Sequence, residues 1–443
     1  MQPHLFRIRT VTAFLSLQAS DFPSPPSQNP DTIDHGALQS SLISTLISLA
    51  SSMLRTMESE LKGAGYEVQT LRIATNPFGE WILPATEEAE EKEITPSDVE
   101  IVKFRLACLD KLLADHNIGF CALGPACTKA EMEELCVPIV ASSPRISCSA
   151  NVKAGDYDTA LAAATCIQQI SKLQGASTSS SSSAGLDNFR FCVTGANCKA
   201  HIPFFPAAKN SADKVGFAVG LENGALAYDL LQQTKYIAHI PTIFRTGMAH
   251  ALQPVQDICV AVATQHSYTY LGIDTSLNPS LDAGGSVAEA IESLLEVDSF
   301  GGPGTIAAAA AITTALQSLP GIQLVGYCGL MLPVCEDERL AALAVRSTTT
   351  ETTTTTTTTK DRLLTITDLL SISSVCGVGI DTVPLAGDVS KERLASLLLD
   401  MAGLAARWDK SLSCRVLPFP GKQVGGRTDF DSPYMVNTEV FDL

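Results

Sequence analysis

A long alternation of short apolar runs with amphipathic segments constrains the fold of this chain more than any single motif. Runs rich in β-branched and aromatic residues predict strands at residues 6–14, 67–74, 118–123, 145–150, 188–196, 215–221, 267–274, 322–328 and 411–417. Segments with apolar residues at helical spacing predict helices at about 37–63, 97–115, 155–173, 243–265, 285–297, 303–318, 335–345, 363–376 and 390–408. Such alternation is typical of a mostly parallel α/β sheet. Nine or ten strands in one series favour a closed barrel or a very large sheet.

Two low-complexity stretches interrupt this pattern without ending it. The Ser-rich stretch 177–185 and the Thr-rich stretch 347–361 have too few apolar residues to pack, so we expect disordered insertions in surface loops. The alternation resumes after each of them, and 45% of all residues are hydrophobic. We therefore expect one large α/β domain over residues 1–443.

The charge of the chain argues against several classes of partner. The formal net charge is −17, and such a surface repels both the phosphates of nucleic acids and anionic membranes. No segment is long, apolar and charge-free enough to span a bilayer. Near the N-terminus, the alternation in RIRTVTAF fits a first strand better than a signal peptide.

The thirteen cysteines do not form a disulfide or zinc pattern. Their number is odd, they are spread along the chain, and no CxxC pair or Cys/His cluster has zinc-ligand spacing. We expect small buried hydrophobes in a reducing compartment and hence a cytoplasmic protein. The alternative is a redox protein, which requires accessible thiols of low pKa.

Two apolar runs end in the same four residues, Gly-Ile-Asp-Thr, and predict acidic groups at strand ends. They place Asp274 and Asp381 where parallel α/β folds bind their ligands. A carboxylate there can act as a general base or bind a divalent cation such as Mg, Ca or Mn. The structural alternative is an aspartate that caps the following helix or turn.

A second pair of acidic residues follows the apolar loop GLMLP. Glu336 and Asp337 open a predicted helix at this point. The tight apolar loop would hold them in a water-poor place, where carboxylate pKa values and metal affinity change most. The alternative is the ordinary preference of acidic residues for a first helical turn.

Three further segments carry residues suited to an anionic substrate or to proton transfer. Gly304 and Thr305 begin an alanine-rich helix, whose open N–H groups suit an anion, whereas a plain helix–sheet packing turn is the alternative. Lys422 and Arg427 are cations on a glycine-rich segment, and a charge-paired tail is their alternative. His201, in an aromatic and proline-bracketed loop, is either catalytic or structural. The chain has no nucleotide, flavin or haem motif.

Many separate strings, taken in order, resemble one family. They are RIRTVTAF, VQTLRIATNPF, FCALGP, NFRFCVTGANCKAHIPFFPAA, LGIDTSLNP, FGGPGTIAAAA, GLMLPVCED, CGVGIDTVPLAGDVS and FPGKQVGGRTDFDSPYMVNT. The chain is similar over nearly its whole length to uncharacterised protein family 0210, also called domain-of-unknown-function family 711. This resemblance implies a ten-stranded α/β barrel like that of pyruvate formate-lyase. It does not imply radical chemistry, because VGGRTDF stands in place of a glycyl radical motif and the chain has no Cys-Cys dyad.

Together these observations favour a non-radical enzyme, a lyase or hydrolase, that acts on a small anionic metabolite. The predicted catalytic groups are Asp274, Asp381, Glu336 and His201. The predicted ligands of a divalent cation are Asp274, Glu336, Asp337 and Asp381. The predicted contacts to the substrate are Gly304, Thr305, Lys422 and Arg427. The rival hypothesis is a non-catalytic module that binds a metabolite and regulates a partner, and a homo-oligomer is left open.

Overall fold

The computed structural model describes residues 5–25, 33–84, 93–173, 185–211, 215–346 and 362–443. Residues 177–184 of the Ser-rich stretch and the whole Thr-rich stretch 347–361 lie outside the described residues. Among the described residues, no helix combines the length and the apolar composition needed to cross a lipid bilayer.

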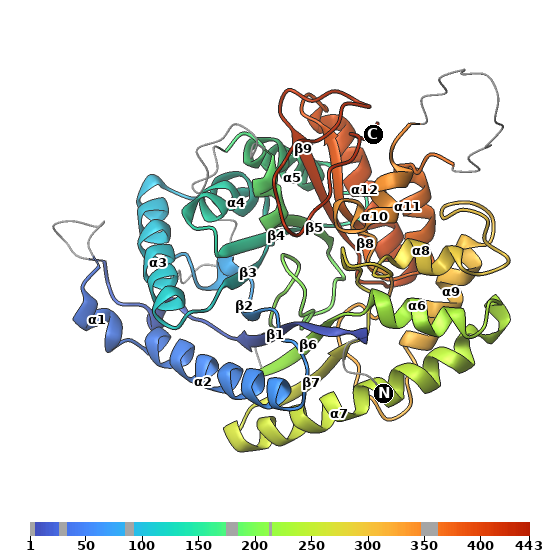
Figure 1. Ribbon diagram of the computed structural model, residues 1–443. Helices are drawn as coiled ribbons and strands as arrows, with labels where there is room; N and C mark the ends of the chain where they lie inside the picture. The colour runs from blue at the N-terminus through green and yellow to red at the C-terminus, as the bar shows by residue number, and fades with distance from the viewer. Residues whose placement is uncertain (1–4, 26–32, 85–92, 174–184, 212–214, 347–361) are drawn as a thin grey trace.

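One mostly parallel sheet forms the centre of the molecule (Figure 1). Its nine strands lie in the order β7-β6-β1-β2-β3-β4-β5-β9-β8. The strands are β1 (Arg7–Leu15), β2 (Leu71–Thr75), β3 (Phe120–Ala126), β4 (Ile146–Val152), β5 (Phe191–Gly195), β6 (Gly216–Glu222), β7 (Thr269–Asp274), β8 (Gly379–Ala386) and β9 (Ser413–Phe419). Strands β1 to β5 are parallel to one another and form an N-terminal group. Strands β6 to β9 form a C-terminal group that meets the first at two antiparallel pairs, β1 with β6 and β5 with β9.

The sheet is not closed, so the expected barrel is not confirmed, and the likeness to pyruvate formate-lyase stays a prediction. The predicted strand at 322–328 forms no continuous ladder. Instead, a bridging segment, residues 323–333, makes isolated bridges to β7 through Leu324 and to β8 through Pro333. Gly326 and Cys328 have φ angles of 79° and 49° within this segment. These left-handed residues break the extended backbone that a strand ladder requires.

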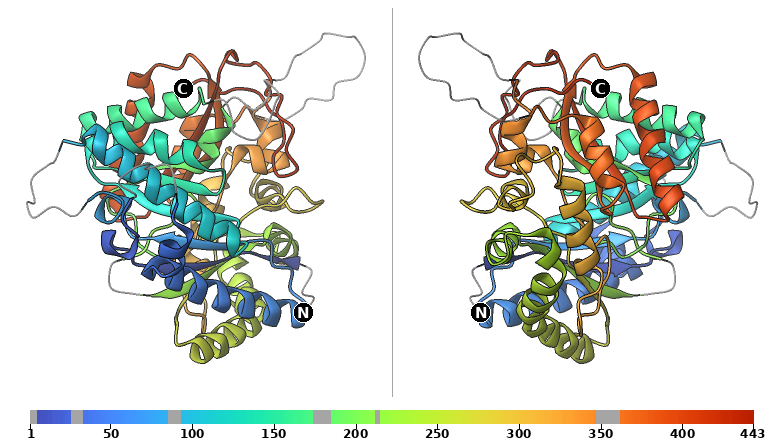
Figure 2. Two further views of the ribbon diagram at one scale, coloured as in Figure 1. Left: turned by 90° about the vertical axis from the view of Figure 1, so that its left-hand side faces the viewer. Right: turned by 90° about the vertical axis from the view of Figure 1, so that its right-hand side faces the viewer.

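Helices surround the outer face of the sheet, as the side views in Figure 2 also show. They are α1 (His35–Gln39), α2 (Leu42–Gly63), α3 (Pro96–Asp115), α4 (Lys129–Ser142), α5 (Tyr157–Ile170), α6 (Gly224–Gln232), α7 (Ile240–His266), α8 (Val287–Glu292), α9 (Thr305–Leu316), α10 (Glu338–Leu343), α11 (Ile366–Ser373) and α12 (Lys391–Trp408). Side chains that accept hydrogen bonds from the first backbone N–H groups define where several of these helices begin. The hydroxyl of Ser41 accepts from the backbone of α2, and Thr95 and Asp98 form a reciprocal capping box on α3.

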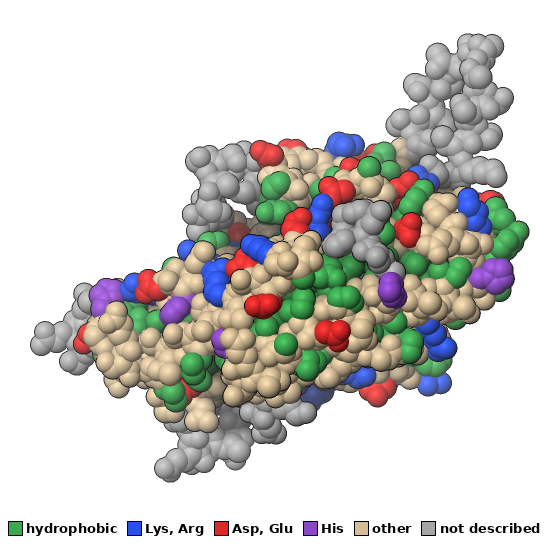
Figure 3. Space-filling view, turned by 60° about the horizontal axis from the view of Figure 1, so that its bottom comes forward, with side chains coloured by type: hydrophobic (Ala, Val, Ile, Leu, Met, Phe, Trp, Pro, Cys, Tyr) green, Lys and Arg blue, Asp and Glu red, His purple; other side chains and the backbone are tan. Residues whose placement is uncertain are grey.

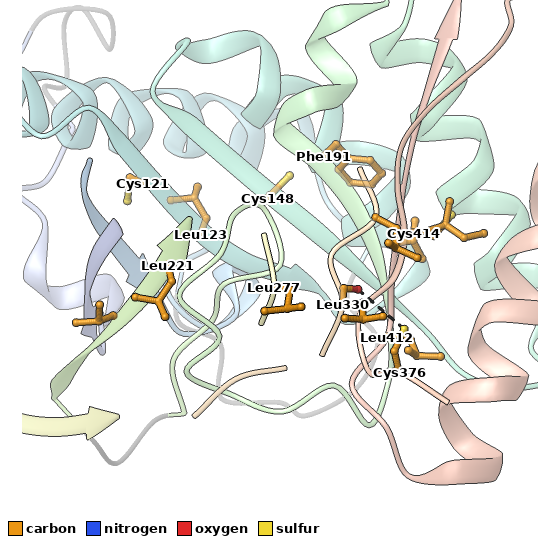
Figure 4. Close-up of a cluster of buried hydrophobic side chains, with 14 of the residues drawn as sticks. Cys121, Leu123, Cys148, Phe191, Leu221, Leu277, Leu330, Cys376, Leu412 and Cys414 are labelled. Atoms are coloured by element: carbon orange, nitrogen blue, oxygen red, sulfur yellow. Dashed lines mark hydrogen bonds between the residues drawn. The ribbon is translucent and has the colours of Figure 1, made fainter. Parts of the chain in front are cut away.

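Cysteines behave as small apolar residues in the core. All thirteen lie in described segments and none forms a disulfide, with twelve buried and only Cys127 exposed. Figure 4 shows Cys121, Cys148 and Cys414 among leucines and Phe191, with the thiol of Cys376 donating to the backbone oxygen of Leu330. Desolvation of the Cys127 thiol and the nearby carboxylate of Glu131 raise the pKa of Cys127, so the exposed thiol lacks the low pKa that the redox hypothesis requires.

A loop between β5 and β6 packs on the inner face of the sheet, opposite the helices (Figure 1). Residues 196–211 of this connecting loop are described. The hydroxyl of Thr12 on β1 donates to the carbonyl of Pro203 at 2.9 Å, and the N–H of Asn210 donates to the carbonyl of Thr75 on β2 at 2.8 Å. Phe204 joins a buried cluster with Tyr327 of the bridging segment. The connecting loop and the bridging segment thus meet on the inner face.

Candidate functional site

A cavity of about 480 Å³ lies on the inner face, between the connecting loop and the strands. The strands of the N-terminal group line it with residues from their first three positions, namely Arg9, Arg72, Phe120, Ser147 and Cys192. The prediction placed the site beyond the carboxyl ends of the strands. The two groups run in opposite directions, so the carboxyl ends of all strands do not meet at one edge, and the cavity lies instead near strand starts.

Arg415, Asp381 and Glu336 form a compact charged group on one wall of this cavity. Arg415 lies on β9 and Asp381 on the neighbouring parallel strand β8, while Glu336 ends a short 3₁₀ turn (Val334–Glu336) after the bridging segment. The guanidinium of Arg415 contacts both oxygens of Asp381, from Nε at 2.6 Å and from Nη2 at 3.0 Å. Its Nη2 also donates to Oε1 of Glu336 at 3.1 Å. Charge-assisted, two-point contacts of this kind fix the plane of all three groups.

The environment of Glu336 favours its protonated form. Burial raises the pKa of Glu336 above its usual range, and Asp381 adds to the increase, although Arg415 and Arg9 act in the opposite direction. Arg9 lies 3.7 Å from the second carboxylate oxygen of Glu336. A raised pKa brings a carboxyl group closer to the range in which it can serve as a general acid as well as a base.

Arg72 faces the same cavity without a carboxylate partner. This β2 residue is only 8% exposed, and its guanidinium carbon lies 5.3 Å from the ring centre of Phe120 and 5.0 Å from that of Phe205. Its Nε donates to the hydroxyl of Thr70 at 2.9 Å, and no described residue forms an ion pair with it. Burial, together with the charges of Arg9 and Arg415, lowers the pKa of Arg72 to about 9.

Asp274 is placed at the end of β7 as predicted, but its carboxylate is fully engaged elsewhere. It is 0% exposed and does not line the cavity. It accepts from the hydroxyl of Ser276 at 2.6 Å and from the backbone N–H groups of Tyr327 at 2.8 Å and Cys328 at 3.0 Å. This arrangement matches the structural alternative, an aspartate that holds a turn, here the turn of the bridging segment.

Asp337 is likewise a helix cap. It is 0% exposed and accepts from the hydroxyl of Ser286 at 2.6 Å, from the N–H of Val287 at 2.9 Å and from the N–H of Leu340 at 3.1 Å. It therefore joins the starts of α8 and α10. Of the four predicted cation ligands, only Glu336 and Asp381 lie together. No group of three or more His, Cys, Asp or Glu side chains within the described residues is arranged to hold a metal ion.

Asp381 is also displaced from its expected place in the strand. The apolar run that ends in Gly-Ile-Asp-Thr was expected to place Asp381 at a strand end, although no strand range was predicted there, whereas β8 begins at Gly379 and continues to Ala386. Asp381 is therefore the third strand residue, and its side chain reaches Arg415 across the sheet rather than a loop beyond the strand.

The remaining predicted residues lie outside the cavity lining. Gly304 caps α9 with a φ of 91°, and the hydroxyl of Thr305 accepts from the N–H of Gly301 at 3.1 Å, so this turn is held by internal contacts. Nε2 of His201 lies 3.0 Å from the side-chain oxygen of Asn210 in the connecting loop.

The two C-terminal cations are not brought to the cavity either. Lys422 forms an ion pair with Asp429 at 3.0 Å, and Arg427 is exposed and bridges to Glu439 through its backbone. The ion pair of Lys422 agrees with the alternative of a charge-paired surface segment, whereas Arg427 forms no ion pair with a described residue.

Sequence reasoning missed the three arginines that define the site, Arg9, Arg72 and Arg415. Arg72 in TLRIAT and Arg415 in SCRVLPF are each the lone cation of a mostly apolar strand, and Arg9 follows Arg7 in RIRTVTAF. An arginine in the interior of a strand buried on both faces needs a polar partner or a ligand, so this pattern is the signal that would have found them.

Comparisons with known proteins agree with the resemblance read from the sequence. A protein from Syntrophobacter fumaroxidans described as "UPF0210 protein" is 34% identical over 161 residues, which are 36% of this chain and 32% of that relative. One of the same description from Pyrobaculum arsenaticum is 25% identical over 252 residues, 55% of this chain and 52% of the relative. The chain thus spans 32% of the first relative's length and 52% of the second's. A family profile described as "Uncharacterised ACR (DUF711)" matches residues 1–431, and the chain belongs to this family.

Proposed function

We propose that this chain is an enzyme that acts on a small anionic metabolite in the cavity by acid–base chemistry, without a protein radical. One observation carries the proposal. Arg72 is a buried guanidinium without a carboxylate partner, and it opens onto the same cavity as Glu336 and Asp381. A buried, uncompensated cation is costly for folding, and a bound anion is the group that would offset this cost.

The size of the cavity fits a metabolite rather than a polymer. Its volume of about 480 Å³ falls within the roughly 300–1,000 Å³ typical of small-molecule sites. Phe189, Phe204 and Met331 supply apolar walls, and ionisable side chains, among them Arg72 and the group around Arg415, also line the cavity. An apolar pocket with a few convergent polar groups is the usual form of an enzyme site.

Glu336 is the group best placed to transfer a proton. Both carboxylate oxygens of Asp381 accept hydrogen bonds from Arg415, whereas Glu336 accepts one from Arg415 through Oε1 only. The pKa of Glu336 is also raised. We assign proton transfer to Glu336 and assign the positioning of Arg415 to Asp381. Arg415 already stands between the two carboxylates, which favours acid–base chemistry over assistance by a divalent cation bound to this pair.

The test compares wild type with Glu336→Gln on pooled carboxylate and phosphate metabolites. Thermal shifts report binding, and mass spectrometry of the pool reports turnover. We expect Glu336→Gln to bind the same compound as wild type and to lose most of its turnover, by about 10²-fold or more. Saturable binding by wild type with no consumption of any compound would instead favour the non-catalytic binding module.

The same preparations test the divalent cation. Elemental analysis of wild type, Glu336→Gln and Asp274→Ala measures Mg, Ca, Mn and Zn per chain. Acid–base chemistry predicts no cation content that depends on Glu336. Near-stoichiometric metal that disappears in Glu336→Gln but persists in a folded Asp274→Ala protein would replace the acid–base mechanism with a cation-assisted one.

A further inference from the structure

We infer that the ligand is a monocarboxylate with an apolar body, whose carboxylate binds the two terminal nitrogens of Arg72. The inference rests on the proposed function and narrows its substrate class. It is drawn from three features of the cavity: the balance of its charges, the geometry around Arg72 and the character of its walls.

Most cations of the cavity already have carboxylate partners. Arg9 pairs with Glu222 at 3.4 Å, Arg145 with Asp110 at 2.9 Å, Arg190 with Asp187 at 2.5 Å and Arg415 with Asp381 at 2.6 Å. Glu67, also on the lining, pairs with Arg7 at 3.1 Å. Glu336 lies 3.1 Å from Arg415 and 3.7 Å from Arg9, two arginines that already have Asp381 and Glu222 as partners. No described carboxylate forms an ion pair with Arg72. The balance of the site therefore depends on the proton of Glu336.

The net charge of the side chains in the cavity determines which ligand charge is favoured. With Glu336 protonated, the site keeps one uncompensated positive charge, that of Arg72. A ligand with one negative charge then makes the site neutral while Glu336 retains the proton that it would donate. A dianion such as a phosphate monoester would leave an excess negative charge beside Glu336 and Asp381 in a buried place, which is strongly unfavourable.

The geometry around Arg72 suits a carboxylate in particular. Thr70 occupies Nε, and no described group accepts a hydrogen bond from either terminal nitrogen. The rings of Phe120 and Phe205 lie on the guanidinium and hold its plane before a ligand arrives. Two parallel N–H donors in one plane match the two oxygens of a carboxylate.

The walls beyond Arg72 require an apolar ligand body. Phe204, Tyr327, Met331 and Val378 belong to one buried hydrophobic cluster, and all four line the cavity. The hydroxyl of Tyr327 already donates to Ser413 at 3.0 Å, so it presents mainly its ring. A ligand rich in hydroxyl groups would leave many of its polar atoms without partners against this surface.

Three probes that share a phenyl ring test the charge and the class. Benzoate carries one negative charge, benzamide is its neutral analogue, and phenyl phosphate is dianionic at neutral pH. By calorimetry and thermal shift, wild type should bind benzoate about tenfold or more tightly than either of the others. Arg72→Met should lose benzoate binding, whereas Arg145→Met, a paired arginine on the same lining, should keep it.

A pH series keeps the inference testable if Arg72→Met fails to fold. The groups facing Glu336 are Arg9, Arg72, Asp381 and Arg415, from four strands. Benzoate affinity of wild type should fall as pH rises through the pKa of Glu336, since the ionised carboxylate removes the charge excess. The affinity of Glu336→Gln should stay level over the same range.

The outcomes separate the two proposals. Arg72-dependent binding of phenyl phosphate that exceeds binding of benzoate would overturn the monocarboxylate assignment and leave an anion-processing enzyme intact. Benzamide binding as tightly as benzoate would also overturn it. No Arg72-dependent binding of benzoate or of phenyl phosphate, together with no consumption of any compound in the metabolite pool, would overturn both proposals.

Discussion

At the scale of single residues, the arginines of the cavity differ in what surrounds them rather than in burial. Arg72 and Arg415 are each 8% exposed, yet Arg415 contacts two carboxylates and Arg72 none. Buried charges are tolerated in proteins when they are paired, so removing a paired and an unpaired arginine should have opposite effects on stability.

The first prediction is that Arg72→Met stabilises the ligand-free protein. The substitution keeps an unbranched side chain, although a shorter one, and removes an uncompensated buried charge, so the free energy of unfolding should rise by about 1–3 kcal/mol. Arg415→Met leaves Asp381 and Glu336 without their cation and should lower it by about 3–5 kcal/mol. Urea unfolding of both variants measures the contrast. Equal destabilisation by the two substitutions would show that Arg72 contributes to the fold and is not held for a ligand.

The second prediction concerns Asp274, whose carboxylate oxygens accept hydrogen bonds from backbone N–H groups of the bridging segment. Asp274→Ala leaves the buried N–H groups of Tyr327 and Cys328 unpaired, which should cost about 3 kcal/mol or more of unfolding free energy. Asp274→Asn keeps one carbonyl oxygen and should cost less. Thermal and urea unfolding distinguish the two variants. A stable Asp274→Ala protein that has lost only turnover would restore the catalytic role that the sequence suggested.

The third prediction is a pH dependence of stability from Glu336. Its pKa is raised in the folded protein, mainly by burial, so the folded state holds the proton more tightly than the unfolded chain does. The stabilising contribution of Glu336 is thus present below its unfolded pKa and is lost as pH rises through its folded pKa. Glu336→Gln should remove this part of the profile. Urea unfolding across that range, for both proteins, measures the difference.

At the scale of elements, the alternation of apolar runs with amphipathic segments predicted most strands and helices. It missed elements that contain a proline or glycines, which usually interrupt regular structure. Helix α4 contains Pro138 and was not predicted, although the capping box of Thr128 and Glu131 marks its start. Strand β8 was not among the predicted strands, because the glycines of CGVGID obscure where extended structure begins. Glu336 and Asp381 were predicted as site residues because each is an acidic residue that follows an apolar run. Their convergence on Arg415 depends on strand order, which local pattern does not contain.

The fourth prediction tests the turn that breaks the bridging segment. A Cβ at Gly326 would lie 2.2 Å from Oδ2 of Asp274, at a φ of 79°, so Gly326→Ala should destabilise the protein by more than about 1 kcal/mol. Gly63, in the last turn of α2, has nothing within 4 Å of a built Cβ. Gly63→Ala is the matched control and should be neutral or slightly stabilising. Thermal unfolding of the two alanine variants measures the contrast. A neutral Gly326→Ala would mean that the turn relaxes readily.

At the scale of the whole molecule, the cationic cavity contrasts with the acidic chain. The net charge is −17, but five arginines line the cavity, Arg9, Arg72, Arg145, Arg190 and Arg415. On the face drawn in Figure 3, basic side chains of the described residues lie beside acidic ones rather than in one patch. Within the cavity, a low dielectric would strengthen the attraction of these arginines for an anion.

The direction of the two strand groups divides the site along the polypeptide. Strands β1 to β5 are complete at Gly195 and supply Arg9 and Arg72, whereas Glu336, Asp381 and Arg415 all come after the connecting loop. In the proposed mechanism, the residue that would bind the anion and the residue that would transfer the proton thus lie in different halves of the chain. Substitutions in the first half can change which compound is accepted while the reaction is kept, and a chain cut within the connecting loop would yield two inert fragments whose reassembly is reported by activity itself.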